Sequence, residues 1–249
     1  MRYTGKLAIS RPELDETMLT TIKTSLKTIP VLGPLAKQLY FRFLAPSVAS
    51  SAEYWESRYR SDGHSGAGSH DRLAQFKAEI LNEFVRSHAV DSVVEFGCGD
   101  GRQLALADYP AYLGIDVSPT ALEQCRARFA GDPSKHFVQS GEQPDRTFDL
   151  ALSLDVIYHL IEDEVFEAYM RTLFDAAHRW AIIYSSNSDA PTPEPHIQHR
   201  RVTDWVATHR KDWRLVEQIG NRYPYDSRNP DLTSFADFYI YERVEPVRA

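Results

Sequence analysis

Cysteine is scarce in this sequence, and its scarcity excludes several kinds of protein. Only Cys98 and Cys125 occur among 249 residues. Two cysteines give neither the framework of a disulfide-stabilised secreted domain nor the spacing of a cysteine metal site. Each is therefore expected to be a buried free thiol, which is typical of a protein in a reducing compartment.

The sequence also lacks long apolar runs and an excess of positive charge. The stretch after Arg2 and Lys6 is polar and acidic, so it does not read as a secretory signal. Residues 29–45 are too short, and too interrupted by a proline and two basic residues, to span a bilayer. The net charge of −7 argues against general nucleic-acid binding. We expect a cytoplasmic protein without a membrane span.

The chain up to residue 88 has the pattern of helices, at about 12–27, 31–45, 51–60 and 72–88. The last of these has apolar residues at helical spacing, which predict one buried face; they are Leu73, Phe76, Ile80, Leu81, Phe84 and Val85. We interpret residues 1–88 as a helical arm followed by a segment that covers a site. The arm is expected to pack on the core or to contact a second copy in a homodimer.

From residue 89 onward, expected strands alternate with expected helices. The strands are 92–96, 111–116, 136–139, 148–154, 180–186, 213–219 and 234–244, and the helices are 102–109, 119–130, 162–179 and 202–210. This alternation predicts parallel strands joined by right-handed crossovers. We expect residues 89–249 to form an α/β, doubly wound, mostly parallel, seven-stranded Rossmann-like sheet, with an acceptor-side insertion at about 186–212. Ligands of such sheets bind at the carboxyl ends of the strands.

The stretch "VVEFGCGDG", residues 93–101, forms a glycine-rich turn after an expected strand. Its spacing departs from the G-x-G-x-x-G pattern of dinucleotide-binding turns. Glu95 and Asp100 would repel a pyrophosphate, but they suit a ligand with an ammonium and a sulfonium group. Asp116 ends the next strand, where an acid can accept hydrogen bonds from both ribose hydroxyls. These requirements describe S-adenosylmethionine.

At three stretches the sequence resembles class I S-adenosylmethionine-dependent methyltransferases: "VVEFGCGDG", "GIDVSP" and "FDLALSLDVIYHL". The resemblance covers roughly residues 90–185. It implies that the methionine part of the cofactor is surrounded by Glu95, Gly97, Gly99 and Gly101. A glycine that only supplies positive φ is the alternative interpretation.

The resemblance also implies positions for the adenosine part. Asp116 would hold the ribose, and Val117 or Ser118 would border the adenine. The family often has an acid after its third strand, where this chain reads "VQSGEQP". Ser140 or Glu142 is the candidate there, while Ser118 has helix capping as its alternative role.

Residues 54–59, "YWESRY", resemble a Tyr-Trp-x-x-Arg-Tyr segment that precedes the core in related methyltransferases. The resemblance implies that this segment folds over the cofactor. Arg58 would then meet the cofactor carboxylate, and Tyr54 or Tyr59 would face the sulfonium. Aromatic packing is the alternative. With "HIQHRRVTDW" and "SFADFYIYER", the segment extends the resemblance to residues 53–243 and to a branch encountered alongside bacterial glycan biosynthesis.

Methyl transfer requires alignment of the acceptor and, for a hydroxyl, removal of its proton. Asp155 and His159 share a face if the loop after 148–154 turns helically, so Asp155 could orient His159 as the base. A packing histidine is the alternative, and Asp155 is also a candidate cofactor ligand. No metal-ligand spacing is present, although Asp155 and the acids at 162–164 leave a metal-assisted variant conceivable.

The long polar stretch after the fifth expected strand has the character of an acceptor loop. The candidate substrate residues are His196, His199, Arg200 and Tyr223. The sequence has no Pro-Pro-aromatic loop of adenine methyltransferases and no Pro-Cys nucleophile. We therefore expect O-methylation of a small molecule, a sugar or glycan. The alternatives are a protein or RNA methyltransferase that uses the basic C-terminal region, and a non-catalytic cofactor-binding scaffold.

Overall fold

The computed structural model describes residues 50–61 and 63–244. The helices and strands, in order, are α3 (Ser51–Arg60), α4 (Asp71–Ser87), β1 (Ser92–Phe96), β2 (Ala111–Asp116), α5 (Pro119–Arg128), β3 (Lys135–Gln139), β4 (Phe148–Leu154), α6 (Asp163–Asp175), β5 (Ala177–Ser185), α7 (Val202–His209), β6 (Trp213–Ile219) and β7 (Asp237–Arg243). The compact unit with the sheet comprises the described residues up to Pro191 and from His196 onward. The expected arm and its homodimer contact lie outside the described residues.

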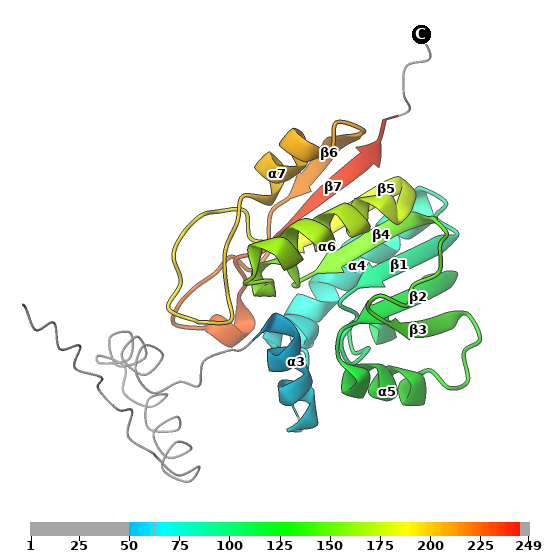
Figure 1. Cartoon of the computed structure of the whole chain (residues 1–249), viewed down its shortest axis with the longest axis horizontal. Helices are drawn as coiled ribbons and strands as arrows, with labels where there is room; N and C mark the ends of the chain where they lie inside the picture. The colour runs from blue at the N-terminus through cyan, green and yellow to red at the C-terminus, as the bar shows by residue number, and fades with distance from the viewer. Residues whose placement is uncertain (1–49, 62, 245–249) are drawn as a thin grey trace, which may run out of the picture. The chain divides into compact units, whose positions relative to one another are not determined.

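The sheet has seven strands in the order β3-β2-β1-β4-β5-β7-β6. The first five are parallel, while β7 runs antiparallel between β5 and β6. The expectation of a mostly parallel, doubly wound seven-stranded sheet is confirmed. The carboxyl ends of the parallel strands meet at one edge, and α3 lies beside that edge (Figure 1).

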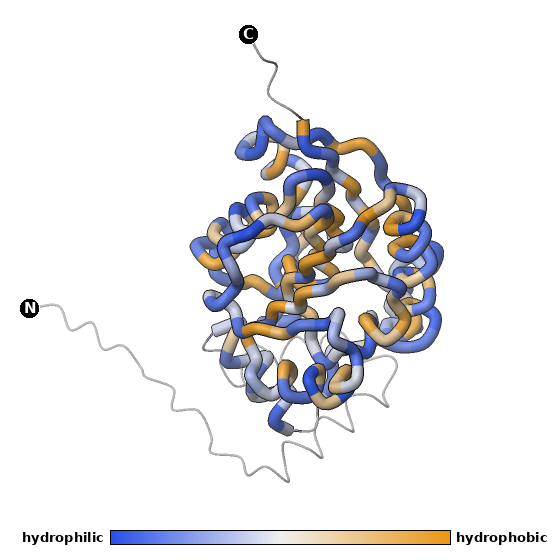
Figure 2. Tube along the Cα trace, turned by 90° about the vertical axis from the view of Figure 1, so that its right-hand side faces the viewer, coloured by the Kyte–Doolittle hydropathy of each residue, from blue (hydrophilic) through white to orange (hydrophobic). Residues whose placement is uncertain are grey.

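Helices cover both faces of the sheet, and each face has its own core. One face carries α4 and α5, with Leu81, Phe84 and Leu122 packed against the strands. The other carries α6 and α7, with Met170, Leu173 and Val202 buried. In Figure 2 the hydrophobic segments run through the middle of the unit and the hydrophilic ones lie mostly around them.

The central strand β4 supplies side chains to both cores because successive strand residues point to opposite faces. Leu150 and Leu152 belong to the core under α4, and Ala151 belongs to the core under α6. A strand buried on both faces reads as a continuous apolar run, as "FDLALSL" does. This burial explains why the sequence predicted the strand with its observed bounds.

One expected helix is not formed, and one expected helix end is misplaced. The segment expected to be helical at 102–109 contains only a 3₁₀ turn, Leu104–Leu106. Asn82 of α4 binds the carbonyl of Leu106 and the amide of Asp108, and Pro110 follows directly, so an α-helix does not continue there. The helix expected to reach residue 179 ends at Asp175. Its last expected residues instead begin β5, which pairs with β4 from residue 177 onward.

Candidate cofactor and acceptor site

A cavity of about 560 Å³ lies at the carboxyl ends of β1, β2 and β4. This volume is in the range of small-molecule binding sites. Several sequence-predicted residues line it: Tyr59, Glu95, Gly97, Gly99, Asp116, Val117, Ser140, Asp155 and His159. The fold thus brings residues from distant parts of the chain to one site.

At two glycines of the turn after β1, a side chain would overlap neighbouring residues. Gly97 and Gly99 have positive φ, 80° and 57°. A Cβ on Gly97 would lie 2.3 Å from Val156 Cγ2, and one on Gly99 would lie 2.4 Å from Ser65 Oγ. Glycine is required at both positions for conformation and for space.

Gly101 has a different role from the other two glycines. A Cβ there would lie 2.8 Å from the ring of Phe129 and 3.0 Å from Cys125 Sγ. Gly101 does not line the cavity, and it allows the turn to pack closely on α5 and the residue after it. Its expected contact with the cofactor remains a prediction.

Asp116, at the end of β2, is buried and holds the turn in place. Its Oδ2 accepts a hydrogen bond from the Gly99 amide at 2.8 Å, and its Oδ1 accepts one from the Ser118 amide at 2.9 Å. Burial raises the pKa of the Asp116 carboxyl, whereas these amides favour its charged form. Ser118 itself caps α5 and does not line the cavity.

Glu95 is the second buried acid of the cavity. Its Oε2 accepts a hydrogen bond from the Tyr112 hydroxyl at 2.6 Å. Burial raises the pKa of Glu95 to about 7. The group therefore titrates near neutral pH, and a cationic group placed beside it would favour the ionised carboxylate.

Helix α3 contributes to the cavity lining and is attached to the core at two points. Near its start, the Ser51 amide and hydroxyl donate to the Glu162 carboxylate at 2.9 and 2.8 Å. Further along, the Glu56 carboxylate accepts from the Ser118 and Thr120 hydroxyls at 2.6 and 2.8 Å. These contacts join α3 to the first turns of α6 and α5, on either side of the cavity.

The aromatic segment on α3 lies at the site, but its members differ in position. Tyr59 lines the cavity, and its hydroxyl lies 3.0 Å from Ser65 Oγ. Arg58 does not line it, because its Nε donates to the His64 carbonyl at 2.8 Å. Tyr54 is also outside the lining and stacks on His196 with ring centroids 4.7 Å apart.

Lys77 is a residue of the site that the sequence analysis missed. Its side chain is 1% exposed, lines the cavity, and places Nζ 2.6 Å from Asp155 Oδ2. Lys77 stands midway between Leu73 and Leu81 on the buried face of α4. A charged residue in the middle of an apolar stripe is the signal that could have revealed it.

Asp155, directly after β4, is held in an uncommon conformation. It has a positive φ of 61°, which non-glycine residues rarely adopt outside special sites. Its Oδ1 accepts a hydrogen bond from the Tyr158 hydroxyl at 2.8 Å, and its Oδ2 accepts the one from Lys77. A Cβ on Gly68 would lie 2.5 Å from Oδ2, so the 63–69 loop closely covers this carboxylate.

The expected hydrogen bond between Asp155 and His159 is not formed. Residues Ile157–His159 form a 3₁₀ turn, in which positions four apart do not share a face. His159 Nδ1 lies instead 3.0 Å from the His196 carbonyl oxygen. Because a carbonyl only accepts, Nδ1 carries the proton and Nε2 is left as an acceptor. Burial lowers the pKa of His159 to about 4.

Aromatic rings gather around His159. Trp55 meets it edge-on at 4.8 Å, and His196 stacks parallel to it at 5.6 Å. Tyr54 stacks on the other side of His196. We call Tyr54, Trp55, His159 and His196 the ring cluster; of these, Trp55 and His159 line the cavity.

The other candidate substrate residues have partners away from the cavity lining. His199 Nδ1 lies 2.7 Å from Ser186 Oγ, and Arg200 binds the Asp163 carboxylate at 2.8 Å. Tyr223 lies beneath the Arg72 guanidinium, 4.4 Å from its centre. The structure does not bring these three to the cavity, and their contact with an acceptor remains a prediction.

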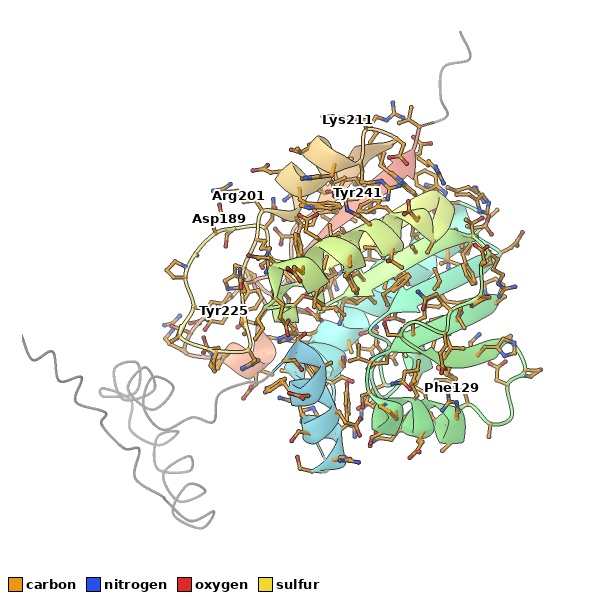
Figure 3. All side chains as sticks on the ribbon, in the orientation of Figure 1. Phe129, Asp189, Arg201, Lys211, Tyr225 and Tyr241 are labelled. Carbon is orange, nitrogen blue, oxygen red and sulfur yellow. The ribbon has the colours of Figure 1, made fainter. Side chains whose placement is uncertain are left out.

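The stretch after β5 is fixed at its far end by a surface ion pair. Arg201 Nε lies 2.7 Å from Asp189 Oδ2, and both side chains are visible at the start of α7 (Figure 3).

Among the described residues, no cluster of three or more His, Cys, Asp or Glu is arranged to hold a metal ion. None of the described helices is both long enough and apolar enough to cross a membrane.

Comparison with known proteins finds a matching domain and a shared fold. Residues 94–181 match a family model described as a methyltransferase domain. No curated protein matches the sequence significantly. Among solved structures, the N-methyltransferase NodS from Bradyrhizobium japonicum WM9, in complex with S-adenosylhomocysteine, is similar with a TM-score of 0.63 and 16% identity. That alignment covers 79% of this chain and 100% of NodS.

Two further structures share the fold. Magnesium protoporphyrin IX methyltransferase (ChlM) from Synechocystis PCC 6803, with bound S-adenosylhomocysteine, has a TM-score of 0.57 and 15% identity, over 77% of this chain and 97% of its own. The methyltransferase domain of bacterial CtHen1-C has a TM-score of 0.55 and 16% identity, over 70% and 100%. The matched methyltransferase domain at residues 94–181 and the shared fold together support S-adenosylmethionine-dependent methyltransferase activity.

Proposed function

We propose that this protein is an S-adenosylmethionine-dependent O-methyltransferase that acts on a hydroxyl of a small acceptor, a sugar or glycan. The observation that carries the proposal is the state of His159. Its Nδ1 donates to the His196 carbonyl, so its Nε2 is an unprotonated acceptor on a residue that lines the cavity. A hydroxyl acceptor needs such a group, because its proton must leave as the methyl group arrives.

The cavity residues fit the proposed cofactor. Gly97 and Gly99 bring the backbone of the turn to the cavity without a side chain, and Asp116 lies at the strand end where an acid suits ribose hydroxyls. Gln103 lines the cavity with a buried Oε1 that has no hydrogen-bond partner among the described residues, which leaves an acceptor for a ligand donor. S-adenosylmethionine, when bound there, supplies an electrophilic methyl group.

The proton of the acceptor would pass to His159 Nε2. The Nδ1 hydrogen bond to the His196 carbonyl fixes the tautomer that makes this transfer possible and stabilises the imidazolium that results. A pKa of about 4 keeps the imidazole neutral, and so able to accept a proton, throughout the physiological pH range. His159 is thus held ready by a backbone carbonyl rather than by Asp155.

The ring cluster supports a small, ring-shaped acceptor. Trp55 and His159 present aromatic surface to the cavity, and His196 backs them on the outside. Small-molecule sites combine such apolar and aromatic surface with a few fixed polar groups, here His159 and the Asp155 carboxylate. The resemblance to a branch encountered alongside bacterial glycan biosynthesis favours sugars among such acceptors.

A labelled-methyl assay tests this function. The protein is incubated with methyl-labelled S-adenosylmethionine and, in parallel, with a panel of free sugars, nucleotide sugars and oligosaccharides, with total protein, and with total RNA. We expect label in the carbohydrate fraction as a methyl ether that survives alkali. Label confined to protein or RNA, or an alkali-labile methyl ester, would contradict the O-methylation of a sugar.

A further inference from the structure

Lys77 is a buried cation that the proposed methyl transfer does not use. Its side chain is 1% exposed, and among the described residues it contacts the Asp155 carboxylate at 2.6 Å and the face of the Tyr184 ring at 5.3 Å. Removing a charge from water is costly, and a buried ion pair is weak evidence for stability. The contribution of Lys77 to stability therefore does not explain its presence, and we infer that it has a role in ligand binding.

The cavity contains several acids but little positive charge. Among the described residues that line it, Lys77 is the only lysine or arginine. Arg58, expected from the sequence to meet the cofactor carboxylate, donates its Nε to the His64 carbonyl and does not line the cavity. Of the lysines and arginines in the described structure, Lys77 is thus the one that lines this cavity and is placed to meet an anionic ligand group.

Lys77 also lies at a definite end of the cavity. It binds Asp155, which follows β4, and its charge lowers the pKa of Glu95 in β1. Asp116 ends β2 and Ser140 follows β3, and both strands lie on the opposite side of β1 from β4. The adenosine end of the cavity and the end with Lys77 are therefore separated by the glycine turn.

The charges at the Lys77 end match an amino acid. The Asp155 carboxylate lies 2.6 Å from the Lys77 ammonium, and the acid Glu95 lines the same cavity. A ligand with both an α-ammonium and an α-carboxylate finds an opposite charge for each. The Lys77 ammonium has three N–H donors, and Asp155 accepts one of them, so donors remain for a second anion.

We propose that Lys77 binds the α-carboxylate of the methionine part of the cofactor and that Asp155 faces its α-ammonium. The inference rests on the cofactor assignment within the proposed function and is independent of the acceptor. It makes Lys77 a cofactor-binding residue that discriminates between ligands with and without the amino acid group.

Titration calorimetry with two ligands tests this inference. S-adenosylhomocysteine carries the amino acid group, and 5′-methylthioadenosine has the same adenosine and thioether without it. In Lys77→Met, we expect affinity for S-adenosylhomocysteine to fall roughly 10- to 100-fold, as for the loss of a charged hydrogen bond, with affinity for 5′-methylthioadenosine unchanged. The matched control is Lys135→Met, because the Lys135 side chain is only 8% exposed, donates to the Tyr109 carbonyl at 2.6 Å, and does not line the cavity. It should change neither affinity.

Two results with Lys77→Met would overturn the inference. One is an equal loss of affinity for both ligands, which would indicate a structural role for Lys77. The other is an unchanged affinity for S-adenosylhomocysteine. If Lys77→Met does not fold, the wild type still decides: decarboxylated S-adenosylmethionine should bind at least about tenfold more weakly than S-adenosylmethionine, and equal affinities would refute the assignment. If the wild type binds none of these ligands, the cofactor assignment itself fails. If it binds them as expected but methylates no sugar, only the acceptor proposal fails.

Discussion

If His159 is the base, its replacement should lower turnover and leave cofactor binding intact. Replacing His159 with alanine removes the acceptor for the hydroxyl proton but none of the residues around Gly97, Gly99 and Asp116. Turnover should fall about 10²- to 10⁴-fold, the usual contribution of a positioned general base. Affinity for S-adenosylhomocysteine should stay nearly unchanged. His178→Ala is a matched control, since His178 is half-exposed beside Asp149 and does not line the cavity.

The pH dependence of the wild type sharpens this prediction. A base is active in its neutral form, so the rate falls as pH drops through its pKa. With a pKa of about 4, about nine-tenths of His159 is neutral at pH 5. With an ordinary pKa of about 6.5, the neutral fraction at pH 5 would be only about 3%. Turnover measured with saturating substrates should therefore be nearly equal at pH 5 and pH 7.

Two results would refute the reasoning about His159. Full turnover in His159→Ala would reduce this residue to packing within the ring cluster. A wild-type rate that falls more than tenfold between pH 7 and pH 5, with S-adenosylhomocysteine binding intact at both, would contradict the lowered pKa. Binding measured in parallel separates a loss of chemistry from a loss of fold or cofactor.

Three further predictions concern the cofactor residues. Asp116→Ala should weaken S-adenosylhomocysteine binding by about 1–3 kcal/mol in calorimetry, through loss of charge-assisted hydrogen bonds, and unchanged affinity in a folded variant would contradict its role. Gly97→Ala should abolish measurable binding of S-adenosylhomocysteine, because its Cβ would lie 2.3 Å from Val156. Full affinity in this variant would show that the turn can move to accommodate the methyl group, which would contradict the prediction. Burial raises the pKa of Glu95 to about 7, and an ammonium ligand favours the ionised form, so binding should strengthen from pH 6 to pH 8 and release protons near pH 7, as titrations in two buffers would detect.

The sequence predicted those parts of the structure that depend on local patterns. Strands such as 92–96 and 148–154 were found because burial on both faces leaves a continuous apolar run. Gly97, Gly99 and Asp116 were found because a turn with positive φ followed by an acid at the next strand end is a local signature. These residues do lie together at the cavity.

The contacts that the sequence did not predict join distant segments. Lys77 and Asp155 are 78 positions apart, and His159 binds a carbonyl 37 positions away. No local pattern indicates that the Asp155 carboxylate already accepts hydrogen bonds from Lys77 and Tyr158. The expected contact between Asp155 and His159 is wrong because residues four apart do not share a face in the observed 3₁₀ turn. Likewise, no local pattern predicts that Arg58 Nε donates to the His64 carbonyl, and the contact of Arg58 with the cofactor carboxylate remains a prediction.

The central claim is that the cavity behind the glycine turn binds S-adenosylmethionine. Titration calorimetry of the full chain with S-adenosylhomocysteine and, separately, with NAD tests it most directly. We expect saturable binding of S-adenosylhomocysteine at one site and no comparable binding of NAD, because the acids Glu95, Asp116 and Asp155 suit a ligand with an ammonium group and a ribose rather than a pyrophosphate. Binding of NAD without binding of S-adenosylhomocysteine would contradict it.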